Sequence, residues 1–378
     1  MKKIVIAGYV RSPFHFAHKG QLTKVRPDDL AAQVVKALIQ KTKIDVNDIE
    51  DLILGCAFPE GEQGFNIARI IGFISGLPIH VGGTTVNRFC GSSMQSIHMA
   101  AGAIQMGAGD VFICAGIESM SRIPMTGFNP SPNPDLFKTK PEVYISMGET
   151  AENVAKKYKI NRSSQEEFSV HSHQKAAKAQ SEGFFDDELT EIIDNHNTIE
   201  KDGCIRVGTN SETLAGLSPA FDVNGSVTAG TSSPLTDGAA AVLVCSEEYA
   251  RSNGIPVMAR IKSIAVHGCA PETMGMGPVF ATKKALERAK IQMSDIDVIE
   301  LNEAFASQAL AVIEESKMNL QKVNIDGGAI ALGHPLGATG ARITGKAASL
   351  LKREGKQLAL STQCIGGGQG VATVLEAA

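Results

Sequence analysis

The sequence lacks the features that mark several large classes of protein. It contains no apolar run of about 18 residues, which a membrane-spanning helix would need. The formal net charge is −4 and the pI about 6.2, so no excess of positive charge points to nucleic acid or a membrane as partner. The seven cysteines form no C-x-x-C pair and no cysteine–histidine cluster with zinc spacing. We therefore expect free thiols in a reducing compartment and no metal site.

Length and composition allow more than one folded unit. The chain has 378 residues, of which 43% are hydrophobic, enough for two or so domains. The opening run K-K-I-V-I-A-G-Y-V predicts a strand, and it has neither an apolar signal core nor an Arg/Ser-rich presequence. We therefore expect a cytoplasmic protein.

An internal repeat predicts a duplicated architecture. Three short matches occur in the same order, the first two at an offset of 247 residues and the third near it: residues 44–57 with 291–304, 111–115 with 358–362, and Val86-Asn87 with Val323-Asn324. Each copy alternates helical patterns with apolar strands. This alternation predicts layered α/β units.

The repeat divides the chain into two halves and an insert. Residues 1–122 and 256–378 form the halves, and residues 226–255 return to the first half as a loop followed by a buried helix or strand. The inserted segment is 123–225, and it starts with a loop rich in proline and asparagine at 123–145. We expect the insert to form a lobe on the first half. Within it, Ser163 and Glu166 predict a capping box before a helix that ends near Ala179.

Cys90 is the first candidate for chemistry. It lies in V-N-R-F-C-G-S-S-M-Q, where an apolar strand gives way to a helical pattern. A thiol at a helix N-terminus faces the positive end of the helix dipole, so we expect its pKa below the ordinary value of about 8.5. The alternative is a small buried hydrophobic residue, which is our interpretation of Cys56, Cys114 and Cys245.

Two further candidates lie on glycine-rich loops near the end of the chain. His334, in L-G-H-P-L-G, can donate to a developing oxyanion or share a proton with a thiol; the alternative is an exposed loop histidine. Cys364, in T-Q-C-I-G-G-G-Q-G, can carry a proton to or from a substrate carbon; the alternative is a buried thiol at a strand end. Together with Cys90, these residues predict acyl transfer through a cysteine thioester.

Asn302 follows the apolar strand V-I-E-L and precedes a helical pattern. Asparagine is a favoured N-cap residue, and the residues alone favour that role here. In the functional alternative, its amide holds a water or a carbonyl group.

Five motifs then match a known family in order along the chain. N-R-F-C-G-S-S-M-Q-S, T-A-G-T-S-S-P-L-T-D-G-A-A-A, N-E-A-F-A, G-G-A-I-A-L-G-H-P-L-G-A-T-G-A-R and C-I-G-G-G-Q-G strongly resemble the thiolases. The resemblance implies an α/β fold of two duplicated halves in a five-layered αβαβα arrangement, with an inserted loop domain.

The resemblance also implies roles for individual residues. Cys90 would be the acyl-carrying nucleophile, and Cys364 the acid/base at the acetyl-CoA methyl carbon. His334 would activate Cys90 and, with a water held by Asn302, stabilise the thioester enolate. The amides of Cys90 and Gly366 would form a second oxyanion hole. The family needs no metal or prosthetic group, because CoA and acyl-CoA are its substrates.

The resemblance also implies contacts with the coenzyme, which fall into two groups. Ser233, Met274 and Phe305 match positions that line the pantetheine tunnel, while Arg206 and Phe221 match positions near the nucleotide.

Two departures from the family pattern bear on specificity. Ser146 replaces a histidine that many acetoacetyl-CoA-forming members have, and Ser218 replaces an arginine in L-R-P-A-F. Ser146 favours the degradative branch, which cleaves 3-ketoacyl-CoA in fatty acid β-oxidation. The alternatives are an acetoacetyl-CoA thiolase and a thiolase-like lipid-binding protein without catalysis. We expect a homodimer or homotetramer, with a β-oxidation hydratase/dehydrogenase as a candidate partner.

Overall fold

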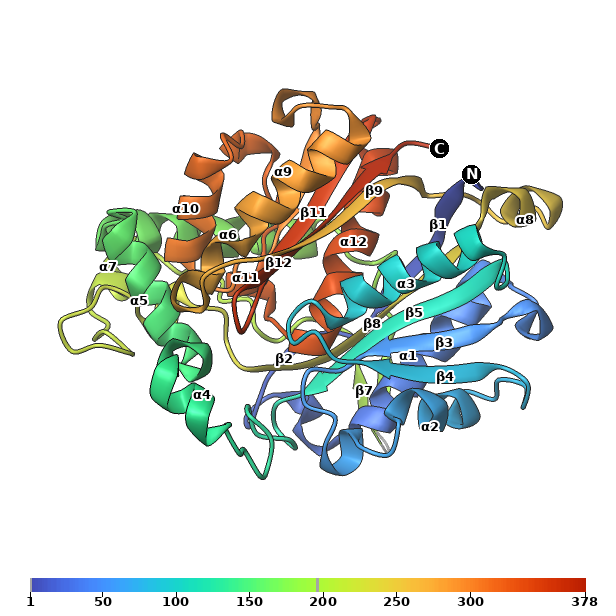
Figure 1. The fold of residues 1–378 in the computed structure, drawn as a ribbon, viewed down its shortest axis with the longest axis horizontal. Helices are drawn as coiled ribbons and strands as arrows, with labels where there is room; N and C mark the ends of the chain where they lie inside the picture. The colour runs from blue at the N-terminus through green and yellow to red at the C-terminus, as the bar shows by residue number, and fades with distance from the viewer. Residues whose placement is uncertain (1, 195–196) are drawn as a thin grey trace.

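The computed structural model describes residues 2–194 and 197–378 (Figure 1). Two helices, α3 (Ser92–Met106) and α12 (Leu336–Arg353), pack together between the strands of the two halves. Helix α1 (Pro27–Thr42) covers the outer face of one set of strands, and α9 (Gly277–Ala289) covers the other. The layers therefore alternate as helix, sheet, helix, sheet and helix.

The strands form one continuous ladder in the order β10-β11-β12-β9-β1-β8-β5-β3-β4, with β2 (His15–Phe16) beside β8. The first half contributes β1 (Ile4–Arg11), β3 (Asp51–Gly55), β4 (Gly82–Val86), β5 (Val111–Ser119) and β8 (Thr236–Ser246). The second half contributes β9 (Ala259–Gly268), β10 (Val298–Leu301), β11 (Leu358–Ile365) and β12 (Gln369–Glu376). Strands β1 and β9 join the halves through two residue pairs.

The remaining elements are shorter or peripheral. The helices are α2 (Ile67–Ile74), α4 (Pro134–Thr139), α5 (Met147–Lys157), α6 (Arg162–Ser181), α7 (Ser211–Ala215), α8 (Glu247–Ser252), α10 (Ala306–Glu315) and α11 (Ala329–Leu332). A hairpin pairs β6 (Ile192–Asp194) with β7 (Asn197–Ile199). The 3₁₀ turns are η1 (Gln21–Lys24), η2 (Val46–Asp48), η3 (Gly61–Gln63), η4 (Pro141–Tyr144), η5 (Ala229–Thr231), η6 (Pro271–Met276), η7 (Met293–Asp295) and η8 (Leu320–Lys322). No described helix is long and apolar enough to cross a membrane.

The sequence repeat matches the strand topology in two of its three parts. Strands β3 and β10 start at residues 51 and 298, and β5 and β11 start at 111 and 358, so both pairs keep the 247-residue offset. Each pair of neighbours, β3 with β5 and β10 with β11, is parallel. The third match is wrong. Val86 pairs with Gly55, whose counterpart at the 247-residue offset is residue 302, but Val323 pairs with Ile299, three residues earlier.

Small residues let the central helices approach the strands closely. A Cβ atom on Gly116 of β5 would lie 2.1 Å from the carbonyl oxygen of Gly337 at the start of α12. A Cβ atom on Gly340 would lie 2.2 Å from the backbone nitrogen of Met94 in α3. This packing leaves the start of α12 little room to move, and the start of α12 follows directly on His334.

The insert packs differently from our expectation. Helix α5 contacts η6 and α10, and α6 contacts α10 and α11, so these helices lie on the second half rather than forming a lobe on the first. Val154 and Phe168 share an apolar cluster with Leu301 and Val312. The insert also meets the first half: Ile192 and Ile199 of its hairpin lie in the apolar core of that half, and Arg11 forms buried ion pairs with acidic residues 188 and 202. Apolar burial on α10 outweighs chain connectivity in placing these helices; the domain boundaries themselves stay a prediction.

Helix α6 starts with a different cap from the predicted one. The side chain of Asn161 accepts a hydrogen bond from the Ser164 N–H at 2.9 Å, so Asn161 is the N-cap. Glu166 pairs with Arg162 instead of returning to Ser163. The capping box at Ser163 is therefore wrong, and the helix extends to Ser181.

Candidate active site

Cys90 lies on a tight turn between β4 and α3. Phe89, just before it, has φ of 42°, an uncommon conformation for a bulky residue. The turn is closed by the Gly91 N–H, which donates to the Arg88 carbonyl at 2.9 Å, and Gly91 is the N-cap of α3. Cys90 therefore precedes the helix rather than forming its first turn. This strand–turn–helix arrangement resembles the turn that presents the nucleophile in α/β-hydrolases.

Burial, not the helix dipole, controls the ionisation of Cys90. The thiol is only 7% exposed, and burial raises its pKa to about 11. The prediction of a lowered pKa is therefore wrong. The backbone N–H groups of Gly366 and of Cys90 itself oppose the rise, because both hydrogen-bond to the sulfur. These are the two amides expected in an oxyanion hole, and both hydrogen-bond to the sulfur of the candidate nucleophile.

Cys364 is an electrostatic neighbour of Cys90. It lies near the end of β11 and is fully buried. Burial is the main cause that raises its pKa well above the ordinary value, and the charge of Cys90 raises it further. The segment after Cys364 packs on the Cys90 turn, since a Cβ atom on Gly91 would lie 2.7 Å from Ile365 Cδ1. The two thiols therefore face one site from the two halves.

The hydrogen bonds of His334 define its tautomer. The Thr339 hydroxyl donates to the Pro335 carbonyl at 3.0 Å, so at His334 Nδ1, 2.6 Å away, it acts as the acceptor. Nε2 is then the unprotonated nitrogen, and it accepts from Asn302 Nδ2 at 3.3 Å. Burial, then the charge of Arg342, lowers the pKa of His334 to about 3. The histidine is a buried neutral base, not an exposed loop residue.

Asn302 does not cap a helix. Helix α10 begins at Ala306 with Phe305 as its N-cap, so the interpretation of Asn302 as a cap is wrong. The Asn302 N–H continues the sheet by donating to the Thr362 carbonyl at 3.0 Å. Its Oδ1 is buried and has no hydrogen-bond partner within the described part of the chain. The amide is thus available to hold a polar group beside His334.

Most of the expected coenzyme contacts gather around Cys364. Met274 and Phe305 belong to one small apolar cluster with that thiol. The ring of Phe221 lies edge-on to Phe305, with centroids 5.9 Å apart. Ser233 donates to the carbonyl just before Phe305 at 3.0 Å. This cluster is the apolar side of the site nearest Cys364.

Arg206 and the two departures lie elsewhere. The Arg206 guanidinium stacks over the ring of Phe16 at 5.0 Å, and the Lys19 ammonium lies over the same ring at 4.5 Å. Ser146 caps α5 by accepting from the Glu149 N–H at 3.3 Å. Ser218 is exposed. Arg206 therefore contacts Phe16, whereas Ser146 directly precedes Met147, which packs against the apolar cluster around Cys364.

Several residues at the site were missed by the sequence analysis. Thr339 orients His334, and Gln363 donates its side-chain N–H to the Cys90 carbonyl. Glu118 is a buried carboxylate that accepts from the Ala57 and Gly337 N–H groups, at 2.8 and 2.9 Å. Its signal was available, as it is the lone charged residue in the apolar run V-F-I-C-A-G-I-E-S.

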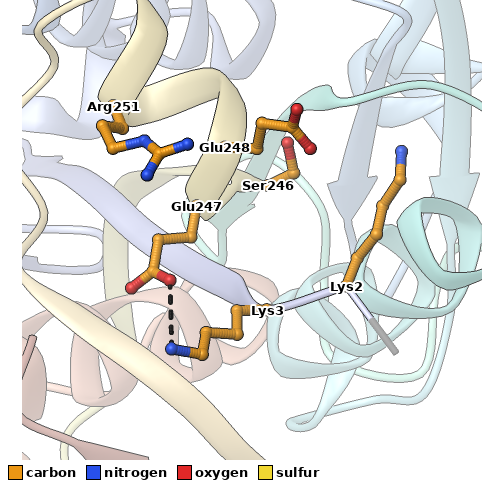
Figure 2. Close-up of a pocket in the computed structure, with 6 residues that line it drawn as sticks. All are labelled: Lys2, Lys3, Ser246, Glu247, Glu248 and Arg251. Atoms are coloured by element: carbon orange, nitrogen blue, oxygen red, sulfur yellow. Dashed lines mark ion pairs between the residues drawn. The ribbon is translucent and has the colours of Figure 1, made fainter.

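The surface hollow in Figure 2 lies away from these residues. It is lined by charged and polar side chains just before β1, at the end of β8 and on α8, including Lys3, which pairs with Glu247 at 3.4 Å. None of the candidate residues lines it. The described residues also include no group of three or more His, Cys, Asp or Glu side chains that could hold a metal ion.

Comparison with known proteins agrees with this geometry. Residues 4–248 match the family model for the thiolase N-terminal domain, and residues 255–377 match the thiolase C-terminal domain. The chain is 49% identical to the 3-ketoacyl-CoA thiolase of Bacillus subtilis (strain 168), with all of both chains covered. The solved human mitochondrial 3-ketoacyl-CoA thiolase in complex with CoA is 35% identical with a TM-score of 0.92, covering 100% of this chain and 98% of that chain.

A second solved structure is equally similar in fold. The acetyl-CoA acetyltransferase of Bacillus anthracis has a TM-score of 0.92 at 38% identity, covering 100% of this chain and 99% of that chain. The fold predicted from the motifs is thereby confirmed. On family models, relatives and fold alike, the chain belongs to the thiolase family.

Proposed function

We propose that this protein cleaves 3-ketoacyl-CoA with CoA, giving acetyl-CoA and an acyl-CoA shortened by two carbons. The observation that carries the proposal is the convergence of the Gly366 and Cys90 amides on the Cys90 sulfur, next to a second buried thiol. The relatives named 3-ketoacyl-CoA thiolase support the same reaction. The steps are reversible, so the same site would run the Claisen condensation.

In the first half-reaction, Cys90 attacks the keto carbon of the substrate. His334 Nε2 takes the thiol proton, because the neutral imidazole has its basic nitrogen free of hydrogen. The amides of Cys90 and Gly366 stabilise the resulting oxyanion. The C2–C3 bond then breaks, Cys364 protonates the departing enolate at carbon, and acetyl-CoA leaves. The acyl group stays on Cys90 as a thioester.

In the second half-reaction, CoA releases the acyl group. Cys364, left as a thiolate, takes the proton of the CoA thiol. The CoA sulfur attacks the thioester, and Cys90 leaves with the proton held by His334. Since these side chains and CoA carry every proton, the proposal requires no metal or prosthetic group.

In this scheme Asn302 helps to stabilise the negatively charged enolate. Its amide lies 3.3 Å from His334 Nε2, and its Oδ1 is buried. We propose that Asn302 holds a water that, with His334, donates to the enolate oxygen.

The alternative is an acetoacetyl-CoA thiolase, which the structural similarity to an acetyl-CoA acetyltransferase keeps open. CoA-dependent cleavage of 3-ketoacyl-CoA substrates with four to sixteen carbons separates the two. Cleavage of substrates with eight or more carbons supports the proposal, and activity confined to four carbons supports the alternative. No activity at any length, with the thiols reduced, would contradict both and favour a non-catalytic lipid-binding protein.

We also propose that the protein works as a homodimer or homotetramer in the cytoplasm. Strand β4 ends the sheet, and the neighbouring Phe65 and Ile79 are 96% and 81% exposed. The seven cysteines are free, which fits a reducing compartment. Light scattering gives the oligomeric state, and co-purification tests for a hydratase/dehydrogenase partner.

A further inference from the structure

Asn302 lies on a segment that no helix supports. The four residues from Asn302 to Phe305 connect β10 to α10 without regular structure of their own. A group that holds a water for an oxyanion needs a fixed position, because the stabilisation depends on distances of about 2.7–3.1 Å. Backbone hydrogen bonds from Asn302 to Thr362 and from Ser233 to Ala304 hold part of this segment, and the two residues that flank Asn302 need further partners.

The side chain of Asn324 forms hydrogen bonds with the residues on both sides of Asn302. Its Oδ1 accepts from the Leu301 N–H at 2.9 Å, and its Nδ2 donates to the Leu301 carbonyl at 2.8 Å. The same Nδ2 donates to Glu303 Oε1 at 2.7 Å. The oxygen and the nitrogen of the amide are thus both engaged, and Asn324 is 1% exposed. Both neighbours of Asn302 are tied to one side chain.

Asn324 is itself held firmly. Its φ is 46°, in the left-handed region that asparagine tolerates better than most residues. Its N–H donates to the Ile299 carbonyl, and its carbonyl accepts from the Gly327 N–H, both at 2.9 Å. Asn324 is thus held by hydrogen bonds of both its backbone and its side chain.

Glu303 links the Asn324 hydrogen bonds to the segment that carries His334. Its buried carboxylate accepts from the Ser172 hydroxyl at 2.6 Å and from the Ile330 N–H at 3.2 Å. Ile330 lies in α11, which ends two residues before His334. Within the described ranges, no lysine or arginine forms an ion pair with Glu303, so neutral donors such as Asn324 must satisfy it.

We propose that Asn324 is a positioning residue that fixes the Asn302 amide relative to His334. It acts through Leu301 and Glu303 and touches no substrate. The inference rests on the proposed role of Asn302 in stabilising the enolate. It predicts that disturbing Asn324 impairs the enolate step and spares the acylation of Cys90.

The test compares two partial reactions in the Asn324→Asp variant. Aspartate keeps the size and the acceptor for Leu301 N–H, but loses the donors and faces Glu303 with a second carboxylate. Deuterium exchange into the methyl group of acetyl-CoA reports the enolate step, and intact mass reports acetylation of Cys90. We expect exchange to fall about ten- to a hundredfold, less than the roughly hundred- to thousandfold effect of losing an oxyanion donor outright, and acetylation to fall less than about threefold.

Controls separate this inference from the proposed function. Asn319→Asp, an exposed neighbour that caps η8, should leave both rates unchanged. Asn302→Ala should itself lower the exchange; if it does not, the proposed role of Asn302 fails. If Asn302→Ala lowers the exchange but Asn324→Asp lowers both rates equally, or neither, the positioning role is contradicted.

A compensating variant keeps the test decisive. In Asn324→Asp combined with Glu303→Gln, the donor and acceptor exchange places, so the bond between the two side chains can form again. The exchange rate of the double variant should then be at least about threefold higher than that of Asn324→Asp. The two variants should have similar melting temperatures, so that a difference in stability does not explain the change. If Asn324→Asp alone does not fold, Asn324→Ser replaces it, and an exchange-to-acetylation ratio equal to that of the wild type in this variant would overturn the inference.

Discussion

The two thiols of the site differ in surroundings more than in ionisation. Cys90 lies on a turn, with two backbone N–H groups directed at its sulfur and with Met120 and Leu336 packed beside it. Cys364 lies at a strand end, among the apolar residues Met274 and Phe305. Burial raises the pKa of both. We therefore propose that position rather than intrinsic acidity assigns their roles: the thiol with the anion donors would be the nucleophile, and the other would move the proton.

We expect the largest effect from replacing the proposed nucleophile. Cys90→Ser should abolish the acyl-enzyme, with cleavage lowered by more than about a thousandfold, because an alcohol is a far weaker nucleophile at neutral pH. Intact mass after incubation with 3-ketoacyl-CoA checks this. An adduct in Cys90→Ser that maps after digestion to a peptide without residue 90 would show that the acyl group resides elsewhere.

Replacing the other thiol should impair the proton-transfer step more than the acetylation of Cys90. Cys364→Ala should keep part of the acetylation of Cys90, while deuterium exchange into the acetyl-CoA methyl group falls by about a hundred- to ten-thousandfold, the usual range for a lost acid/base. If exchange persists at the wild-type rate, the assignment of Cys364 as the proton carrier is wrong.

The pH dependence of alkylation tests the ionisation of the pair. Since the pKa of Cys90 is raised to about 11 and that of His334 lowered to about 3, both groups are neutral at pH 7. The rate of Cys90 alkylation by iodoacetamide should therefore rise about tenfold per pH unit between pH 7 and 9. A rate that is already constant across this range would indicate a preformed thiolate–imidazolium pair.

Smaller effects should separate the two apolar surroundings. Phe221→Ala removes the ring contact with Phe305 on the Cys364 side, so the KM for CoA should rise about three- to tenfold with little change in kcat. Phe58→Leu alters the packing beside Cys90 and should change the preference for acyl length instead. Steady-state kinetics with varied CoA and varied acyl length compares them; equal changes in both variants would remove the distinction.

Sequence reasoning located Cys90, His334 and Cys364 because glycine-rich loops and strand ends leave a local pattern. It misjudged the pKa of Cys90, since burial depends on segments far away in the chain, such as Ile365, which packs on the Cys90 turn. It misread Asn302 as a helix cap because the start of α10 depends on contacts that no local pattern encodes. The residues that hold the site, such as Asn324, are invisible for the same reason.

One measurement tests the central claim most directly. The purified, reduced protein is incubated with 3-ketooctanoyl-CoA without added CoA, and its mass is measured intact and after digestion. We predict a hexanoyl group on the peptide that contains Cys90, lost when CoA is added. The absence of any adduct, or an adduct on Cys364 alone, would contradict the account.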